Sequence, residues 1–121
     1  MLKQNYRLKK KYQFNYVYRV GKACHGKHHL LVFTPSKNLN VKIGISVSKK
    51  VGNAVKRNRA RRLLREAIMP FLPLLDPNYN VILVAKESII DKKLSDVQTD
   101  LEKTIEKAGI KKKWESFFFL L

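Results

Sequence analysis

The chain has 121 residues, with 26 Lys or Arg against 9 Asp or Glu and a formal net charge of +17 at pH 7. This length is typical of one domain, which we expect to span residues 1–121. The single cysteine, Cys24, excludes an internal disulfide and fits a reducing compartment, so we expect a cytoplasmic protein. No apolar run approaches the roughly 20 residues of a transmembrane helix, and the N-terminus lacks the apolar core of a secretory signal. We therefore expect no membrane partner.

The positive charge is concentrated in the first half of the chain. Residues 1–65 hold 18 Lys or Arg and no Asp or Glu, whereas residues 66–121 hold 8 Lys or Arg and 9 Asp or Glu. The two halves therefore carry +18 and −1, which sum to the +17 of the whole chain. Unopposed charge of this size repels itself and destabilises a compact state, so the asymmetry favours a polyanionic partner over a merely solvated surface.

Residues 1–10 are expected to form a loose basic segment. A helix is predicted over Lys11–Val20, ended by Gly21 as a C′ residue. Four aromatic residues in this helix lie on two adjacent strips, and we expect some to pack and others to stay accessible. One strip holds Phe14, Val17 and Tyr18, and the other holds Tyr12 and Tyr16.

The apolar run Leu30–Thr34 predicts a strand, and residues 35–40 predict a turn. A second strand, Val41–Val47, is expected to pair with the first as a hairpin. The segment before the first strand contains Cys24 and three histidines. Its spacing matches no structural zinc pattern, so we expect these histidines to be solvated or near phosphate and predict no metal site in the protein.

A basic loop and a basic helix follow the second strand. The loop is Lys49–Asn53, and the helix begins near Ala54. Arginine suits phosphate because its planar fork donates two hydrogen bonds at once. One side of the helix is cationic, and the other carries apolar residues at the helical period that can dock on a sheet: Ala60, Leu63, Leu64, Ala67, Ile68 and Phe71.

The second half of the chain completes an α-β-β-α-β-α order. Pro70 and Pro73 end the basic helix. The apolar run Tyr79–Ala85 predicts a central strand buried on both faces. A last helix is expected to start with Ser95 as its N-cap and to end at Gly109.

No catalytic constellation can be argued from the sequence. The basic half lacks the carboxylates with which a nuclease would hold Mg²⁺. The aspartates of the second half are expected to be helix caps and surface charges: Asp76, Asp91, Asp96 and Asp100.

Residues 46–67, SVSKKVGNAVKRNRARRLLREA, resemble the signature of the bacterial ribonuclease P protein subunit. The resemblance is centred on Arg57-Asn58-Arg59 and extends from about Arg7 to Ala108. It implies an α+β fold, a small two-layer sandwich like domain 2 of ribosomal protein S5, with a left-handed βαβ crossover. General rules would predict the opposite hand. The core would span about residues 7–109, and the role of the tail, residues 110–121, is left open.

The resemblance also implies a role for each surface. The partners would be a catalytic RNA subunit, which chiefly binds the Mg²⁺, and precursor tRNA with its 5′ leader; no small-molecule substrate is expected. The basic helix and loop would contact the RNA subunit through Lys49, Lys50, Asn53, Lys56, Arg57, Asn58, Arg59, Arg61, Arg62 and Arg65. A cleft beside the first helix would hold the leader through Phe14, Tyr18, Phe33, Lys11, Arg19 and Lys42.

Some alternatives remain open. Asn53 and Asn58 could serve only as caps and turn residues, and Phe14 and Phe33 could serve only in core packing. A structural RNA-binding protein, such as a small ribosomal protein, would share the charge without needing an aromatic cleft. A stand-alone nuclease would cut precursor tRNA without an RNA subunit, which we do not expect.

Overall fold

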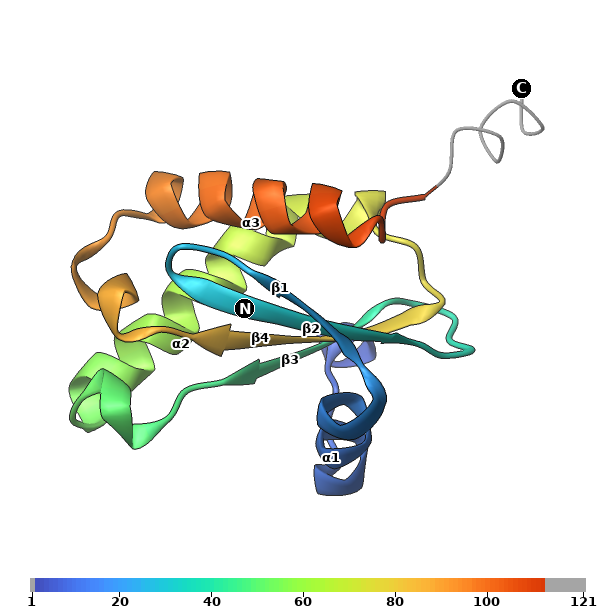
Figure 1. Ribbon diagram of the computed structural model, residues 1–121, viewed down its shortest axis with the longest axis horizontal. Helices are drawn as coiled ribbons and strands as arrows, with labels where there is room; N and C mark the ends of the chain where they lie inside the picture. Colours follow the sequence, from blue (N-terminus) through green and yellow to red (C-terminus); the bar gives the residue numbers. More distant parts are fainter. Residues whose placement is uncertain (1, 113–121) are drawn as a thin grey trace.

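The computed structural model describes residues 2–112 and confirms the α+β class (Figure 1). The helix Lys11–Val20 and the strand Tyr79–Ala85 have the predicted bounds, and the basic helix begins at Ala54 as predicted. One strand, β1, is present in addition to the predicted elements. The helices and strands are, in chain order, α1 (Lys11–Val20), β1 (Lys22–His25), β2 (His29–Pro35), β3 (Lys42–Ser46), α2 (Ala54–Ile68), β4 (Tyr79–Ala85) and α3 (Leu94–Ala108).

The four strands form one sheet in the order β1-β2-β4-β3. The predicted hairpin between the strands that flank residues 35–40 is wrong, because β4 lies between β2 and β3. β2 pairs antiparallel with β4, and β3 pairs parallel with β4 through a crossover that contains α2. The apolar β4 takes the middle of the sheet, as its composition predicts, since only a strand covered on both faces can be apolar throughout. The hand of the crossover and the likeness to the ribosomal domain stay predictions.

Strand β1 has a sequence that gives little sign of a strand. It is only four residues long, Lys-Ala-Cys-His, and mostly exposed. It pairs antiparallel with β2 from Lys22 opposite Phe33 to His25 opposite Leu30. An edge strand needs apolar residues on only part of its length, so neither periodicity nor composition marks it.

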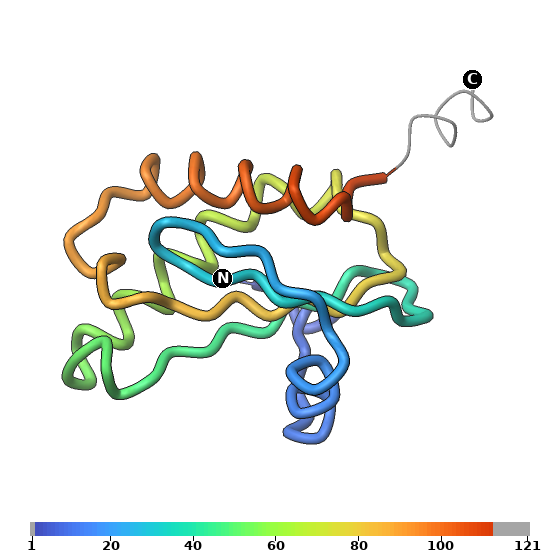
Figure 2. The backbone as a smooth tube through the Cα atoms, in the orientation of Figure 1, coloured from blue at the N-terminus to red at the C-terminus, as the bar shows by residue number. Residues whose placement is uncertain are grey.

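Helices cover both faces of the sheet (Figure 1). α2 contacts β3 and β4, and α3 contacts β1, β2 and α2 on one face, while α1 contacts β2 and β4. Figure 2 shows α1 on the side of the sheet away from α2 and α3. The predicted apolar side of the basic helix is confirmed for five residues buried in the larger core: Ala60, Leu63, Leu64, Ala67 and Ile68. The sixth, Phe71, lies beyond the helix in the 3₁₀ segment Met69–Leu74 and packs partly buried against the same core. Within residues 2–112, no helix is long and apolar enough to cross a membrane.

The N-terminal segment is ordered, which corrects the expectation of a loose one. Leu2 and Leu8 are buried, with exposed fractions of 4% and 6%. Arg7 forms a parallel bridge with Ile43 of β3, and the Leu8 N–H donates a 2.9 Å hydrogen bond to the Ile43 carbonyl. These two apolar residues fix the segment across the sheet, so the charges between them are held in place.

The helix ends agree with the prediction in part. Gly109 ends α3 in the left-handed region, with φ of 67°. Gly21 ends α1, as predicted, in an extended conformation, and a Cβ there would lie 2.4 Å from the Val17 carbonyl oxygen. The N-cap of α3 is Lys93 and not Ser95, because the Asp96 carboxylate already accepts a 3.2 Å hydrogen bond from the Lys93 N–H.

The first residues of the predicted tail belong to the core. Ile110 is buried, with an exposed fraction of 1%, and Lys111 bridges to Leu75. The remainder of that tail, residues 113–121, lies outside the described residues.

His29 and Asp100 form a buried polar pair, so the expectations of a solvated histidine and a surface aspartate are wrong at these positions. His29 Nδ1 lies 2.8 Å from Asp100 Oδ2, and His29 Nε2 lies 2.8 Å from Thr104 Oγ1. The Asp100 carboxylate also accepts hydrogen bonds from the backbone N–H groups of Lys27 and His28, both at 2.8 Å. The pair joins the β1–β2 turn to α3, a contact between segments more than 70 residues apart that no local pattern predicts.

Burial sets the protonation of this pair. Burial lowers the pKa of His29 below its ordinary 6.5, although the Asp100 carboxylate raises it, so the imidazole is neutral at pH 7. Burial raises the pKa of Asp100, but the two backbone hydrogen bonds and the contact with His29 together lower it by more and hold that pKa below its ordinary 3.8. A neutral histidine therefore donates its Nδ1–H to an ionised carboxylate.

Candidate nucleic-acid interface

Two residues of the loop before α2, Gly52 and Asn53, set the conformation in which that helix begins. Gly52 has φ of 145°, a conformation that other residues rarely adopt, and a Cβ there would lie 2.7 Å from the Lys56 side chain. The Asn53 side chain then accepts a 3.0 Å hydrogen bond from the Lys56 N–H, which makes Asn53 the N-cap. Lys49, Lys50 and Lys56 are all exposed around this start. The capping alternative for Asn53 is therefore confirmed, and its predicted RNA contact stays a prediction.

The outward side of α2 carries unpaired positive charge. Arg57, Arg61 and Arg65 are half-buried and Arg62 is exposed. Within residues 2–112, no arginine forms an ion pair with a carboxylate. Asn58 accepts a 3.0 Å hydrogen bond from Arg61, and it lines a hollow of about 350 Å³ together with Arg61, Arg62, Arg65 and Glu66. The helix thus presents a row of guanidinium groups whose charge is almost unopposed.

Arg59 is placed differently from the other arginines of α2. Its Nε donates a 2.9 Å hydrogen bond to the Ile90 carbonyl, and one terminal nitrogen lies 3.5 Å from the Lys92 carbonyl. Ile90 belongs to the 3₁₀ segment Glu87–Asp91 that follows β4, and Lys92 is the C-cap of that segment. Arg59 therefore links that segment to α2 through hydrogen bonds, whether or not it also contacts RNA.

Phe14 lies on α1 and faces β3. Its ring packs against Gly44, where a Cβ would lie 2.6 Å from two ring atoms. The glycine therefore lets the aromatic ring approach the strand closely. The half-buried Phe14 lines a hollow of about 300 Å³ with Arg7, Lys9, Gly44 and, from α2, Arg65.

Phe33 is not brought together with Phe14. Successive residues of a strand face opposite sides of a sheet, and Phe33 packs on the core beneath α2 and α3, whereas Phe14 packs on the smaller core beneath α1. Phe33 also meets Tyr79 edge to face, with ring centroids 6.0 Å apart. In this structure Phe33 has the core-packing role that the sequence left open.

The other four residues of the predicted cleft lie on α1 and β3. Tyr18 and Lys11 are exposed on α1, and the Arg19 guanidinium lies 5.7 Å from the centre of the Tyr16 ring. The Lys42 ammonium donates a hydrogen bond to the Asn5 carbonyl. Lys42 thus points toward the N-terminal segment.

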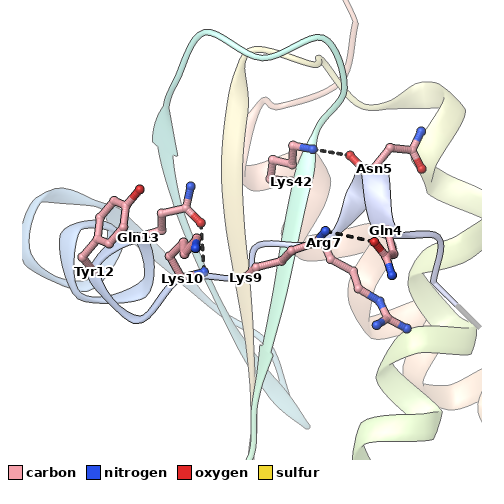
Figure 3. A pocket seen from close by; sticks show the side chains of 8 residues that line it. All are labelled: Gln4, Asn5, Arg7, Lys9, Lys10, Tyr12, Gln13 and Lys42. Carbon is pink, nitrogen blue, oxygen red and sulfur yellow. Dashed lines mark hydrogen bonds between the residues drawn. The ribbon is translucent and has the colours of Figure 1, made fainter.

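That contact is part of a basic hollow that the sequence did not reveal (Figure 3). The hollow has a volume of about 330 Å³ and lies between the N-terminal segment, β3 and the start of α1. Arg7, Lys9, Lys10 and Lys42 line it together with Tyr12. Lys9 and Lys42 are held by neutral acceptors, the Gln4 side chain and the Asn5 carbonyl, so their charge is not cancelled. Finding the hollow from sequence would require knowing that Arg7 pairs with β3.

These features define a small α+β protein with one strongly cationic surface and an aromatic residue laid on its sheet. The sequence pattern of the family Ribonuclease P matches residues 2–109. The Ribonuclease P protein component of Staphylococcus carnosus strain TM300 is 36% identical over 110 residues, covering 90% of this chain and 95% of that protein. The protein component of Fusobacterium nucleatum subsp. nucleatum is 36% identical over 107 residues, covering 85% and 96%.

Solved structures of RNase P proteins have the same fold as this chain. The RNase P protein of Staphylococcus aureus superposes with a TM-score of 0.77 at 29% identity, over 87% of this chain and 96% of that one. The RNase P protein of Thermotoga maritima superposes with a TM-score of 0.75 at 18% identity, over 84% and 96%, which supports the fold alone. The chain belongs to the ribonuclease P protein family.

Proposed function

We propose that this chain is the RNA-binding protein component of ribonuclease P and assists a catalytic RNA in removing the 5′ leader from precursor tRNA. The observation that carries the proposal is the outward side of α2, where the guanidinium groups are free of carboxylate partners across the described residues. Such an array suits the phosphates of a folded RNA, because each arginine can donate two hydrogen bonds to one phosphate.

The loop and α2 would bind the RNA subunit, and the hollow beside Phe14 would receive the single-stranded leader. A base can stack on an aromatic ring whatever its identity, and nearby cations can follow the phosphates. Phe14 supplies the ring there, and Arg7, Lys9 and Arg65 supply the cations. Arg65 lines both this hollow and the one on α2, so leader and RNA subunit would meet at that residue.

Mg²⁺ belongs, in this proposal, chiefly to the RNA subunit, whose phosphates supply oxygen ligands. Over residues 2–112, no three His, Cys, Asp or Glu side chains are grouped so that they could hold a metal ion. The protein would bind and position RNA, while hydrolysis of the phosphodiester bond would take place at the RNA.

The proposal is tested by cleavage of a precursor tRNA by a bacterial ribonuclease P RNA at low Mg²⁺, with and without this protein. We expect marked stimulation by the protein and no cleavage by the protein alone. Tight binding to the RNA without stimulation would support a structural RNA-binding protein instead. Cleavage by the purified protein, free of RNA, would support a stand-alone nuclease.

A further inference from the structure

Four hollows on the surface are joined to one another by shared residues. Arg65 lines both the hollow on α2 and the one beside Phe14. Arg7 and Lys9 line both the hollow beside Phe14 and the N-terminal hollow of Figure 3. Tyr12 and Gln13 line both the N-terminal hollow and a fourth, larger one of about 580 Å³ between α1 and the end of the sheet at Ser36 and Asn80. Neighbouring hollows therefore adjoin one another, and together they make up a track from α2 past Phe14 and the start of α1 to Tyr16 and Arg19.

The chemistry of this track is uniform beyond α2. Among residues 2–112, no Asp or Glu lines the hollow beside Phe14, the N-terminal hollow or the hollow beside Tyr16. Cations occur in each of the three, from Arg65 and Arg7 at one end to Arg19 at the other. A path of this kind attracts a polyanion along its whole length.

The last hollow also offers aromatic faces. Tyr12 and Tyr16 are one helical turn apart on α1, so their rings lie on the same side of the helix. They are 69% and 49% exposed, so both rings are accessible to a ligand. Arg19 lies over the Tyr16 ring, and Asn15 and Asn80 add amide groups at the rim. Exposed rings beside a guanidinium group and amides are what single-stranded RNA uses for base stacking and hydrogen bonding.

We propose that Tyr12 and Tyr16 form a second stacking platform for the precursor leader, occupied by nucleotides upstream of those that lie beside Phe14. The inference rests on the proposed leader binding and extends it around the N-terminal end of α1. Arg7, Lys9 and Lys42 carry the phosphates between the two platforms. Short leaders end before the tyrosines, and longer leaders reach them.

The test uses the holoenzyme, made from this protein and a bacterial ribonuclease P RNA, and a series of precursors whose leaders grow one nucleotide at a time. Equilibrium binding is measured for the wild type, for Tyr12→Ala with Tyr16→Ala, and for Phe14→Ala. For the double tyrosine variant we expect wild-type affinity with short leaders and about a tenfold loss with long ones. The Phe14→Ala variant should lose affinity at shorter leaders.

Matched variants separate stacking from other causes. Tyr12→Phe with Tyr16→Phe keeps both rings and should bind long leaders as the wild type does. Leu39→Ala removes an exposed apolar side chain away from the track and should change nothing. Because both tyrosines are largely exposed, their removal should leave the far-ultraviolet circular dichroism spectrum unchanged.

The outcomes separate this inference from the proposed function. If wild-type affinity never rises with leader length, leader binding fails and the platform fails with it. If affinity rises but the double tyrosine variant follows the wild type, the platform alone is refuted. Equal loss for every precursor and for mature tRNA would assign the tyrosines to the RNA subunit and overturn the inference.

Discussion

The carboxylate of Asp100 joins two parts of the chain that are far apart in sequence. It accepts hydrogen bonds from the backbone of the β1–β2 turn and from His29, and all of these groups are wholly or partly buried. Gly26 makes room for the pair, since a Cβ there would lie 2.7 Å from the His29 ring and 2.8 Å from Asp100. The sequence shows these residues only as an aspartate on a predicted helix and a histidine before a strand. Their roles depend on how α3 lies on the sheet.

The His29–Asp100 pair should make stability depend on pH. Burial lowers the pKa of His29, and the nearby Lys86 and His28 lower it further. The Asp100 carboxylate raises this pKa but by less, so the net shift is downward. The unfolded chain therefore takes up a proton near pH 6.5 while the folded protein does not. The free energy of unfolding should be highest above this pH and fall as the pH drops from there toward the lower pKa of the folded protein. Asp100 stays ionised throughout, because its pKa lies below 3.8.

Urea unfolding across this pH range is the measurement. The variant His29→Gln should be less stable near neutral pH but should lose most of the pH dependence in this window. His25→Gln, which changes an exposed histidine of β1, is the control and should keep the dependence. A wild-type stability that stays flat or rises on acidification would contradict the assignment of a neutral His29.

At the scale of elements, α2 combines two kinds of arginine that look alike in sequence. Arg59 donates to backbone carbonyls of the segment after β4. Arg62 is exposed and donates to no residue of the described chain. Replacing Arg59 with Ala should therefore lower stability by about 1 kcal/mol and also weaken RNA binding. Replacing Arg62 with Ala should weaken RNA binding and leave stability within about 0.5 kcal/mol of the wild type.

Thermal unfolding and binding to a ribonuclease P RNA, measured on the same two variants, check this difference. Equal stability of both variants would mean that the Arg59 contacts contribute nothing to the fold. Lys103→Ala, an exposed lysine of α3, controls for the loss of one positive charge.

The elements that the sequence predicts best are those whose pattern is local. α1, β4 and the start of α2 follow from periodicity, apolar composition and the asparagine cap. The pairing of strands does not, because β2 and β3 are close in sequence yet separated by β4. Phe33 shows the same limit at the candidate site: its position in β2 is predicted, but the face of the sheet to which it belongs depends on α3. The N-terminal hollow could not be predicted, because the residues that line it come from the N-terminal segment, α1 and β3, whose arrangement in space the sequence does not show.

At the scale of the whole molecule, the net charge of +17 should govern affinity for RNA. Each lysine or arginine that contacts a phosphate releases counterions, so affinity should fall steeply as salt concentration rises. Replacing Arg62 and Arg65 together with Ala should reduce the slope of log affinity against log salt by roughly 1.5 in total. Binding to the RNA subunit between low and moderate salt is the measurement.

A second double variant tests whether position or total charge matters. Lys103→Ala with Lys107→Ala removes the same charge from the exposed side of α3. We expect this variant to keep nearly the wild-type slope. Equal changes in both variants would show that the RNA responds to net charge and not to the surface of α2.

The ordered N-terminal segment has a consequence for solubility. β3 is the last strand of the sheet, and its outer side meets the bridge of Arg7 with Ile43 and the hydrogen bond from Leu8. Without them, the unpaired N–H and C=O groups of β3 would be free to pair with a strand of another molecule. A protein that lacks residues 2–8 should therefore self-associate as its concentration rises, and light scattering should detect the aggregates. Residues 2–8 thus protect the β3 edge from pairing with another molecule.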